Sequence, residues 1–246
     1  MKSSICFICM LLLLIGCQNH DKLTFEPVLI QSESNVNCTI QIKIPQAIDD
    51  TKLARVVNTA LREEVISLLH FDEESGVSDI NTAMASFESG FEILQQRYAD
   101  ETTPWEAKID AEITFENASI LSIALNAFLF TGGAHGYSSE RFLNFDKIEG
   151  HELENWQLFK NSEAFQHLAE SKFRAQENIP PDKPINHTGF MFEEDSFYLP
   201  ENIGFTEKGL TLLYNQYEIS SFADGTLELV LPFEEIQKFM ATETKL

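Results

Sequence analysis

Two long stretches of the chain alternate apolar and polar residues with a period of two. The alternation covers Val36–Ile44 and, most regularly, Trp105–Glu116. It predicts strands with one buried side and one solvent-facing side, which is typical of antiparallel sheets. Ile120–Phe130 is apolar on both sides, so we expect it to be a central strand, and Ser138–Asp146 is predicted to follow as a further strand.

Apolar residues recur at helical spacing in three other segments. Leu53–Leu69, about Asp79–Tyr98 and about Ser162–Gln176 each carry one apolar stripe, which predicts helices that pack on a core through one side. Pro232 is predicted to open a short terminal helix, because proline is tolerated in the first helical turn. Shorter strands are expected at Phe197–Leu199, Ile203–Thr206, Leu210–Tyr214 and Thr226–Leu231.

The order of these elements indicates the fold class. Helices are separated from runs of consecutive strands, which predicts an α+β fold with antiparallel sheets and helices packed on one face. We expect two small subdomains, at residues 36–147 and 148–246, preceded by a polar tether at residues 18–35. A chain of 246 residues is long enough to bury cores of this size.

Residues 1–17 have the pattern of a secretory leader. Lys2 precedes an apolar run at Ile5–Ile15, which is too short for an ordinary spanning helix of about 20 residues. The run ends in Leu14-Ile15-Gly16-Cys17, which resembles a bacterial lipobox. The resemblance implies cleavage before Cys17 and its lipidation, so the protein would meet the membrane only through this anchor. The alternative is a plain secretory leader that ends near a cysteine.

The cysteines and the net charge indicate which linkages and which classes of binding partner to expect. Cys38 is the one cysteine outside the leader and the lipobox, so no disulfide framework is expected, and its apolar register predicts a buried thiol. The formal net charge is −22, and loss of Lys2 with the leader makes it −23. Acidic residues spread along the chain disfavour binding to nucleic acid and favour a basic protein partner. Acidity that only keeps the protein in solution is the default alternative.

The turn Thr131-Gly-Gly-Ala-His-Gly136 is the first candidate site. Gly132 and Gly133 allow positive φ, so their N–H groups could cradle an anion, and His135 could bind a ligand or carry a proton. The turn precedes a strand and not a helix, so it is neither a P-loop nor a dinucleotide fingerprint. A structural corner with His135 bonded to the backbone is favoured over a binding site that includes His135 and Tyr137.

Motifs for catalysis or metal binding are weak. The six histidines show no paired spacing and no Gly-x-Ser-x-Gly occurs. Neighbouring glutamates such as Glu63 and Glu64 do not face each other on a helix. We therefore expect no metal, no cofactor and no catalysis. Tyr214–Ile219 mixes aromatic rings with polar tips, which makes Tyr217 and Glu218 candidates for a binding surface, or else part of a buried hydrogen-bonded tyrosine corner.

Several motifs together resemble a bacterial envelope family catalogued as domain of unknown function 3298, usually preceded by companion domain 4163. The similarity spans about residues 36–242 and includes two substitutions, Gln216 for a proline and Phe222 for a tyrosine. It implies that the first subdomain is of the 4163 type and the second of the 3298 type. The motifs are Thr131–Gly136, Asn144-Phe-Asp146, Gly150, Gly204–Leu210, Tyr214–Ile219 and Gly225–Pro232.

The resemblance implies a binding role in the cell envelope. The family includes the extracellular part of a lysozyme-sensing anti-sigma factor and the region preceding a peptidoglycan deacetylase domain. We expect a non-catalytic module that binds a cationic protein such as lysozyme. The alternatives are peptidoglycan or another glycan bound through exposed aromatic residues such as Trp156, and a hydrolase using His135 with Glu218. Gln18 is not the aspartate associated with inner-membrane retention, which favours the outer membrane.

Overall fold

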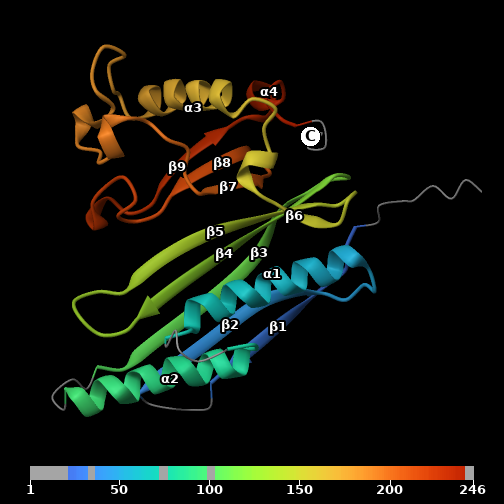
Figure 1. The fold of residues 1–246 in the computed structure, drawn as a ribbon, viewed down its shortest axis with the longest axis vertical. Helices are drawn as coiled ribbons and strands as arrows, with labels where there is room; N and C mark the ends of the chain where they lie inside the picture. Colours follow the sequence, from blue (N-terminus) through green and yellow to red (C-terminus); the bar gives the residue numbers. More distant parts are fainter. Residues whose placement is uncertain (1–21, 33–36, 72–76, 99–102, 242–246) are drawn as a thin grey trace, which may run out of the picture.

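The computed structural model describes residues 22–32, 37–71, 77–98 and 103–241. It contains two β-sheets, each covered by helices on its outer side (Figure 1). The leader and Cys17 lie outside the described residues. No helix in the described part of the chain combines the length and the apolar character that a membrane crossing requires.

The first sheet has six strands in sequential order, from β1 to β6. All neighbours pair antiparallel except β2 and β3, which are parallel because helices α1 and α2 form the connection between them. The strands are β1 (Phe25–Gln31), β2 (Cys38–Ala47), β3 (Trp105–Glu116), β4 (Ile120–Phe130), β5 (Tyr137–Asp146) and β6 (His151–Leu153).

Helices α1 (Lys52–Leu69) and α2 (Ile80–Arg97) cover one face of this sheet. Each begins at a residue whose side-chain oxygen accepts a hydrogen bond from a backbone N–H in the first turn, Thr51 for α1 and Asp79 for α2. Their apolar stripes and the inward side chains of β2 to β5 form the first hydrophobic core. Trp105, the first residue of β3, is buried there against the rings of Phe71, Phe87 and Phe91.

The second sheet has three antiparallel strands, β7 (Asn202–Thr206), β8 (Gly209–Tyr214) and β9 (Leu227–Leu231). Helices α3 (Ser162–Gln176) and α4 (Phe233–Ile236) complete this layer. The second core is rich in aromatic residues, and Phe173 of α3 contacts the rings of Phe190, Phe192, Phe197 and Tyr214.

Strand β4 contributes to both cores. Leu121, Ile123 and Leu125 point to the first core, whereas Ile120 points to the second. Ala124 packs on Phe142 and Leu213 between the sheets. Because alternate residues of a strand face opposite sides, the predominantly apolar sequence of β4, interrupted only by Ser122 and Asn126, is explained by burial on both faces, as predicted for a central strand.

A buried polar network joins the two sheets. The Asn144 side chain donates from Nδ2 to the Ile203 carbonyl at 2.7 Å and accepts from Ser122 Oγ at 2.8 Å. The Phe205 N–H donates to Ser122 Oγ at 3.2 Å. Beside this network, the backbone of Gly204 lies so close to Phe142 that an added Cβ would be 2.0 Å from Phe142 Cδ1. Two motif residues singled out in the sequence, Asn144 and Gly204, thus hold the layers together.

The predicted α+β class with mainly antiparallel sheets is confirmed. Two local predictions were wrong. Part of the predicted tether, Phe25–Gln31, is strand β1, because Phe25, Val28 and Ile30 pack on the first core while the strand pairs with β2. Phe197–Leu199 is not a strand, since its rings fill the second core from an irregular segment.

The division into subdomains at residues 147 and 148 stays a prediction. Strand β6 extends the first sheet to Leu153. Cys38 is fully buried and is a free cysteine in the described part of the chain, as its apolar register predicted.

Candidate functional site

Two rows of side chains cross strands β3, β4 and β5 on the face turned away from α1 and α2. The antiparallel register aligns Asp110 with Asn126, and Asn126 with Glu140. The next row consists of Lys108, Phe128 and Ser138. Since side chains two residues apart on a strand share a face, both rows face the same side.

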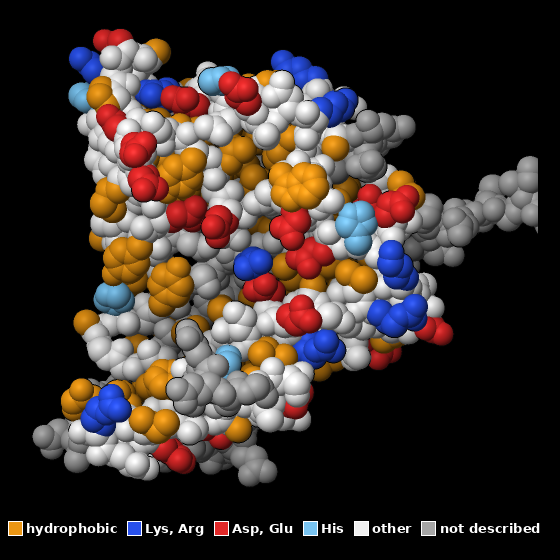
Figure 2. Space-filling model, viewed as in Figure 1, with side chains coloured by type: hydrophobic (Ala, Val, Ile, Leu, Met, Phe, Trp, Pro, Cys, Tyr) orange, Lys and Arg blue, Asp and Glu red, His pale blue; other side chains and the backbone are white. Residues whose placement is uncertain are grey.

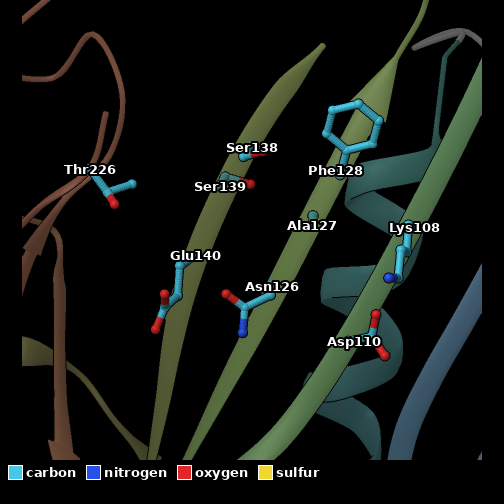
Figure 3. Close-up of a pocket in the computed structure, with 9 residues that line it drawn as sticks. All are labelled: Lys108, Asp110, Asn126, Ala127, Phe128, Ser138, Ser139, Glu140 and Thr226. Carbon is cyan, nitrogen blue, oxygen red and sulfur yellow. The ribbon is translucent and has the colours of Figure 1, made fainter. Parts of the chain in front are cut away.

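These rows form the floor of a cavity of about 320 Å³. Thr226, which precedes β9, lines it from the second layer, so the cavity lies where the two sheets diverge (Figure 3). We call this cavity the polar groove and define it by Lys108, Asp110, Asn126, Phe128, Ser138, Ser139, Glu140 and Thr226. It combines an amide, hydroxyls, an aromatic ring, two carboxylates and an ammonium group.

The outer edge of β5 is tied to the second layer beside the polar groove. The Glu140 N–H donates to Asn215 Oδ1, and Asn215 Nδ2 donates to the Glu140 carbonyl, both at 2.9 Å. The side-chain amide thus takes the place that a neighbouring strand would occupy. This ties Glu140 to the connection between β8 and β9, which also carries Thr226.

The polar groove has a negative potential. Burial raises the pKa of the Glu140 carboxyl, and the nearby charges of Glu228 and Glu112 raise it further. A like charge close to a carboxyl disfavours its ionised form. A cation bound beside Glu140 would favour the ionised form of its carboxyl.

A second cavity of about 320 Å³ lies on the other side of β5 and shares Ser139 and Glu140 with the polar groove. Arg141 reaches from β5 to Glu64 of α1, with an Nε–Oε1 distance of 3.1 Å. Burial raises the pKa of Glu64 despite the charge of Arg141, and it also raises the pKa of Glu152 on β6. On the face shown in Figure 2, Asp and Glu side chains gather along the junction of the two layers.

The predicted glycine turn is the tip of the β4–β5 hairpin. Gly132 and Gly133 have φ of 94° and 86°, values that favour glycine. Gly132 lies over the indole of Trp105, whose buried Nε1 has no hydrogen-bond partner in the described part of the chain. The turn therefore has the backbone geometry expected for a structural corner, and it covers the end of the first core.

His135 extends from this turn to the second layer. Its ring stacks on Phe222 with 3.8 Å between the ring centroids, and Phe222 lies 5.6 Å from the ring of Tyr217. His135 Nδ1 is also 3.2 Å from the Gly136 carbonyl. The structure thus brings together His135 and Tyr217 through Phe222, the residue that stands where the resembling family has a tyrosine.

The other two candidates have different surroundings. Tyr137 lines the cavity on the α1 side of β5. Glu218 accepts a hydrogen bond from the Asn215 N–H at 2.9 Å, and burial raises its pKa. His135 and Glu218 do not form a hydrogen bond with each other. Glu218 therefore closes the turn that positions Asn215, which is a structural role that the sequence motif did not reveal.

Sequence reasoning missed the polar groove. Lys108 and Asp110 were expected on the wet side of a strand, but Asn126, Glu140 and Asn215 were not singled out. The signal available was a polar residue at position 126 inside a strand that is otherwise apolar except for Ser122. In the described part of the chain, no group of three or more His, Cys, Asp or Glu side chains is placed to hold a metal ion.

Comparison with known families gives two matches in succession along the chain. Residues 31–138 match the family described as deacetylase PdaC, and residues 157–234 match the family described as protein of unknown function DUF3298. The resemblance expected from the sequence motifs is thus confirmed. Comparison with curated proteins gives no match.

Two solved structures share the fold over nearly the whole chain. A DUF3298 family member from Bacteroides fragilis is 20% identical, with a TM-score of 0.69 over 92% of this chain and 96% of its own. A DUF3298 family protein from Pseudomonas aeruginosa is also 20% identical, with a TM-score of 0.63 over 91% of this chain and 97% of its own. At this identity the likeness establishes the fold.

Proposed function

We propose that this protein is a lipid-anchored binding module of the bacterial cell envelope, without catalytic activity, whose polar groove receives a basic side chain of a cationic partner protein such as a lysozyme. The observation that carries the proposal is the carboxyl of Glu140. Burial, and then the charges of Glu228 and Glu112, raise its pKa. A lysine or arginine placed beside it would stabilise the ionised form.

The envelope assignment has two supports. The chain matches the PdaC and DUF3298 families, which suggests a domain associated with the cell envelope. The leader and the Leu14–Cys17 segment fit export and lipid anchoring, with the outer membrane as the expected location. The net charge of −22 would steer a basic protein towards the acidic surface.

Geometry supports one basic group in the groove. Asp110 and Glu140 flank Asn126 in one row of the floor, and Lys108 lies in the next row. A long basic side chain that enters between the sheets would place its charge near the two carboxylates and its aliphatic part on the ring of Phe128.

The test is titration of the protein with lysozyme at low and at physiological ionic strength. We expect binding that weakens as salt rises, because the contact is between charges. The double variant Asp110→Asn/Glu140→Gln is expected to lose at least about tenfold in affinity, which corresponds to about 1.4 kcal/mol.

The matched control is Glu26→Gln/Asp182→Asn, which changes the net charge equally at exposed positions away from the groove. It is expected to bind nearly as well as the unmodified protein. No binding at low salt would eliminate lysozyme as the partner. Equal losses in both double variants would show that overall charge, and not the groove, is recognised.

Glycan binding is the second candidate, and one specific observation favours it. Tyr217 is 56% exposed and has a left-handed backbone, with φ of 69°, beside the rings of Phe222 and His135. A non-glycine residue held in this strained conformation with an exposed ring is a feature typical of binding surfaces. Aromatic rings of this kind can pack on the faces of sugars.

Tyr217→Gly separates binding from stability, because glycine adopts positive φ without strain. The variant is expected to fold at least as stably and to be retained less on purified peptidoglycan sacculi if this surface binds glycan. Retention equal to that of the unmodified protein would remove the aromatic surface from consideration.

A further inference from the structure

We infer that one end of the first sheet, which carries Lys22 and the turn between β5 and β6, rests on the surface of the lipid bilayer. Ile48 and Ile148 make the contact. The inference depends on the lipid anchor proposed above for Cys17. It adds a defined contact and a defined orientation to that anchor.

The length of chain between Cys17 and the fold sets how far this end can be from the membrane. Lys22 follows Cys17 by five residues, and five residues span at most about 18 Å when fully extended. Lys22 Nζ lies 3.9 Å from Glu116 Oε2 at the end of β3, and Leu23 is buried in the first core. An acylated Cys17 would therefore hold the end of the sheet close to the lipid headgroups.

Two exposed isoleucines are found at this end. Ile48 is 51% exposed and follows β2, and Ile148 is 50% exposed in the turn between β5 and β6. They flank the first turn of α1, where Lys52 Nζ donates to the Glu149 carbonyl at 2.8 Å. Apolar side chains presented together by turns fit the boundary between headgroups and acyl chains, where their exposure to water is reduced.

The antiparallel register fixes the orientation that follows. The start of β1, the start of α1 and the β5–β6 turn lie at one end of the sheet, and the β4–β5 hairpin lies at the other (Figure 1). The 11 residues of β4 separate these ends by about 36 Å at about 3.3 Å per residue. A bilayer at the first end leaves the β4–β5 hairpin, with His135, directed away from the membrane.

The net charge makes the apolar character of this contact important. A protein of charge −22 is repelled by anionic headgroups, so attraction of the whole surface to lipid is not expected. The acyl anchor supplies the affinity for the membrane in this arrangement. The two isoleucines then select which end of the molecule is turned towards it.

Tryptophan reporters in the full-length, acylated protein test the inference. Ile48→Trp and Ile148→Trp are each reconstituted into vesicles of phosphatidylethanolamine and phosphatidylglycerol that contain brominated lipids, which quench tryptophan on contact. Ile93→Trp is the matched control, because Ile93 is also exposed, at 45%, but lies on α2. We expect the brominated lipids to reduce the fluorescence of the tryptophan at position 48 or 148 at least twofold. For Ile93→Trp we expect no quenching beyond that of the native tryptophans.

The outcomes separate the inference from the proposed anchor. Protein that is acylated and floats with vesicles, but shows no quenching at either isoleucine position, would overturn the docking surface and leave the anchor intact. Equal quenching at positions 48, 93 and 148 would also overturn it, since no end would then be selected. Protein that carries no acyl chain and does not float with vesicles would overturn the anchor and the docking surface together.

Discussion

The side-chain amide of Asn215 pairs with the backbone of Glu140 through two hydrogen bonds of 2.9 Å, as a strand would. β6 covers only the last residues of β5, from Asn144 to Asp146. In the part of the chain that the structure describes, the outer edge of β5 near Glu140 has no strand beside it. An unpaired strand edge is a template for association with other chains, and Asn215 closes this edge at its centre.

Asn215→Ala is expected to lower the free energy of unfolding by about 1–3 kcal/mol, because it leaves the N–H and the carbonyl of Glu140 without partners. Urea denaturation of the variant measures this. Asn81→Ala, on the exposed face of α2, is the control and should change stability little. If Asn215→Ala lowers the free energy of unfolding no more than the control does, water replaces the amide without cost.

Glu140→Gln is expected to stabilise the protein at pH 7. The pKa of Glu140 is raised in the folded protein, so the native state binds more protons than the unfolded state between the ordinary carboxyl pKa of about 4.3 and the raised value. Stability therefore falls as pH rises through this window. Glutamine removes the free-energy cost of ionising Glu140 in the folded protein. The gain in stability at pH 7 should therefore vanish below about pH 4.

Urea titrations at pH 7 and near pH 4 check this pH dependence. Glu26→Gln on the edge strand β1 provides the control for the change in net charge. If Glu140→Gln were destabilising at pH 7, the Glu140 carboxylate would be making a favourable interaction, and the negative potential assigned to the groove would be wrong.

Gly204→Ala is expected to destabilise the protein more than Gly90→Ala. Both added Cβ atoms would lie within 3 Å of a phenylalanine ring, Phe142 and Phe71 respectively. Phe142 is buried between the sheets and cannot move, so Gly204→Ala should cost about 1–3 kcal/mol or more. Phe71 is 48% exposed and can swing outward, but it then loses packing on Trp105, which offsets the gain of up to about 1 kcal/mol in helix propensity from Gly90→Ala.

Thermal denaturation of the two glycine variants is the measurement. Similar melting temperatures for both would mean that the sheets adjust around an extra methyl group at Gly204. The close contact between Gly204 and Phe142 would then contribute little to stability.

Asn144→Ala is expected to cost about 2–4 kcal/mol. The change leaves Ser122 Oγ and the Ile203 carbonyl unpaired in a buried interface. The double variant Ser122→Ala/Asn144→Ala should lose less than the sum of the two single variants, because the groups form one network. Additive losses in guanidinium denaturation would contradict a shared network.

Cys38 is expected to react slowly with thiol reagents in the folded protein. Burial, and then the charge of Glu88, raise the pKa of the thiol from 9.0 to about 11. At pH 8 this reduces the thiolate fraction by about a hundredfold, before any effect of access. Labelling at pH 8 with and without guanidinium, followed by peptide mapping, checks the prediction. Fast labelling of Cys38 without denaturant would show that the sheet opens locally at β2.

Alternation and helical spacing were sufficient to predict most elements. The predicted bounds of β3 and β4 agree with the structure at both ends, since each strand has a continuous pattern that burial imposes. β1 was missed because Phe25, Val28 and Ile30 do not alternate regularly around Pro27, and the strand is stabilised by pairing with β2. Such pairing is a long-range property that a local pattern does not carry.

The polar groove depends on register and on contacts between distant segments. Asp110, Asn126 and Glu140 form one row because the turn after β3 and a register shift between Ile113 and Phe115 set the alignment. Asn215 reaches Glu140 across 75 positions of sequence. The glycine turn was visible in the sequence, whereas its stacking partner Phe222 depends on how the second layer packs.

The sharing of β4 between two cores has a consequence for the order in which the chain can fold. The outer face of β4 is covered by residues from β7 onwards. The second layer itself closes late, because Phe159 bridges Met240 and the Ala241 N–H donates to the Leu158 carbonyl. A chain that emerges N-terminus first therefore leaves the outer face of β4 uncovered until its last residues are available to close the second layer.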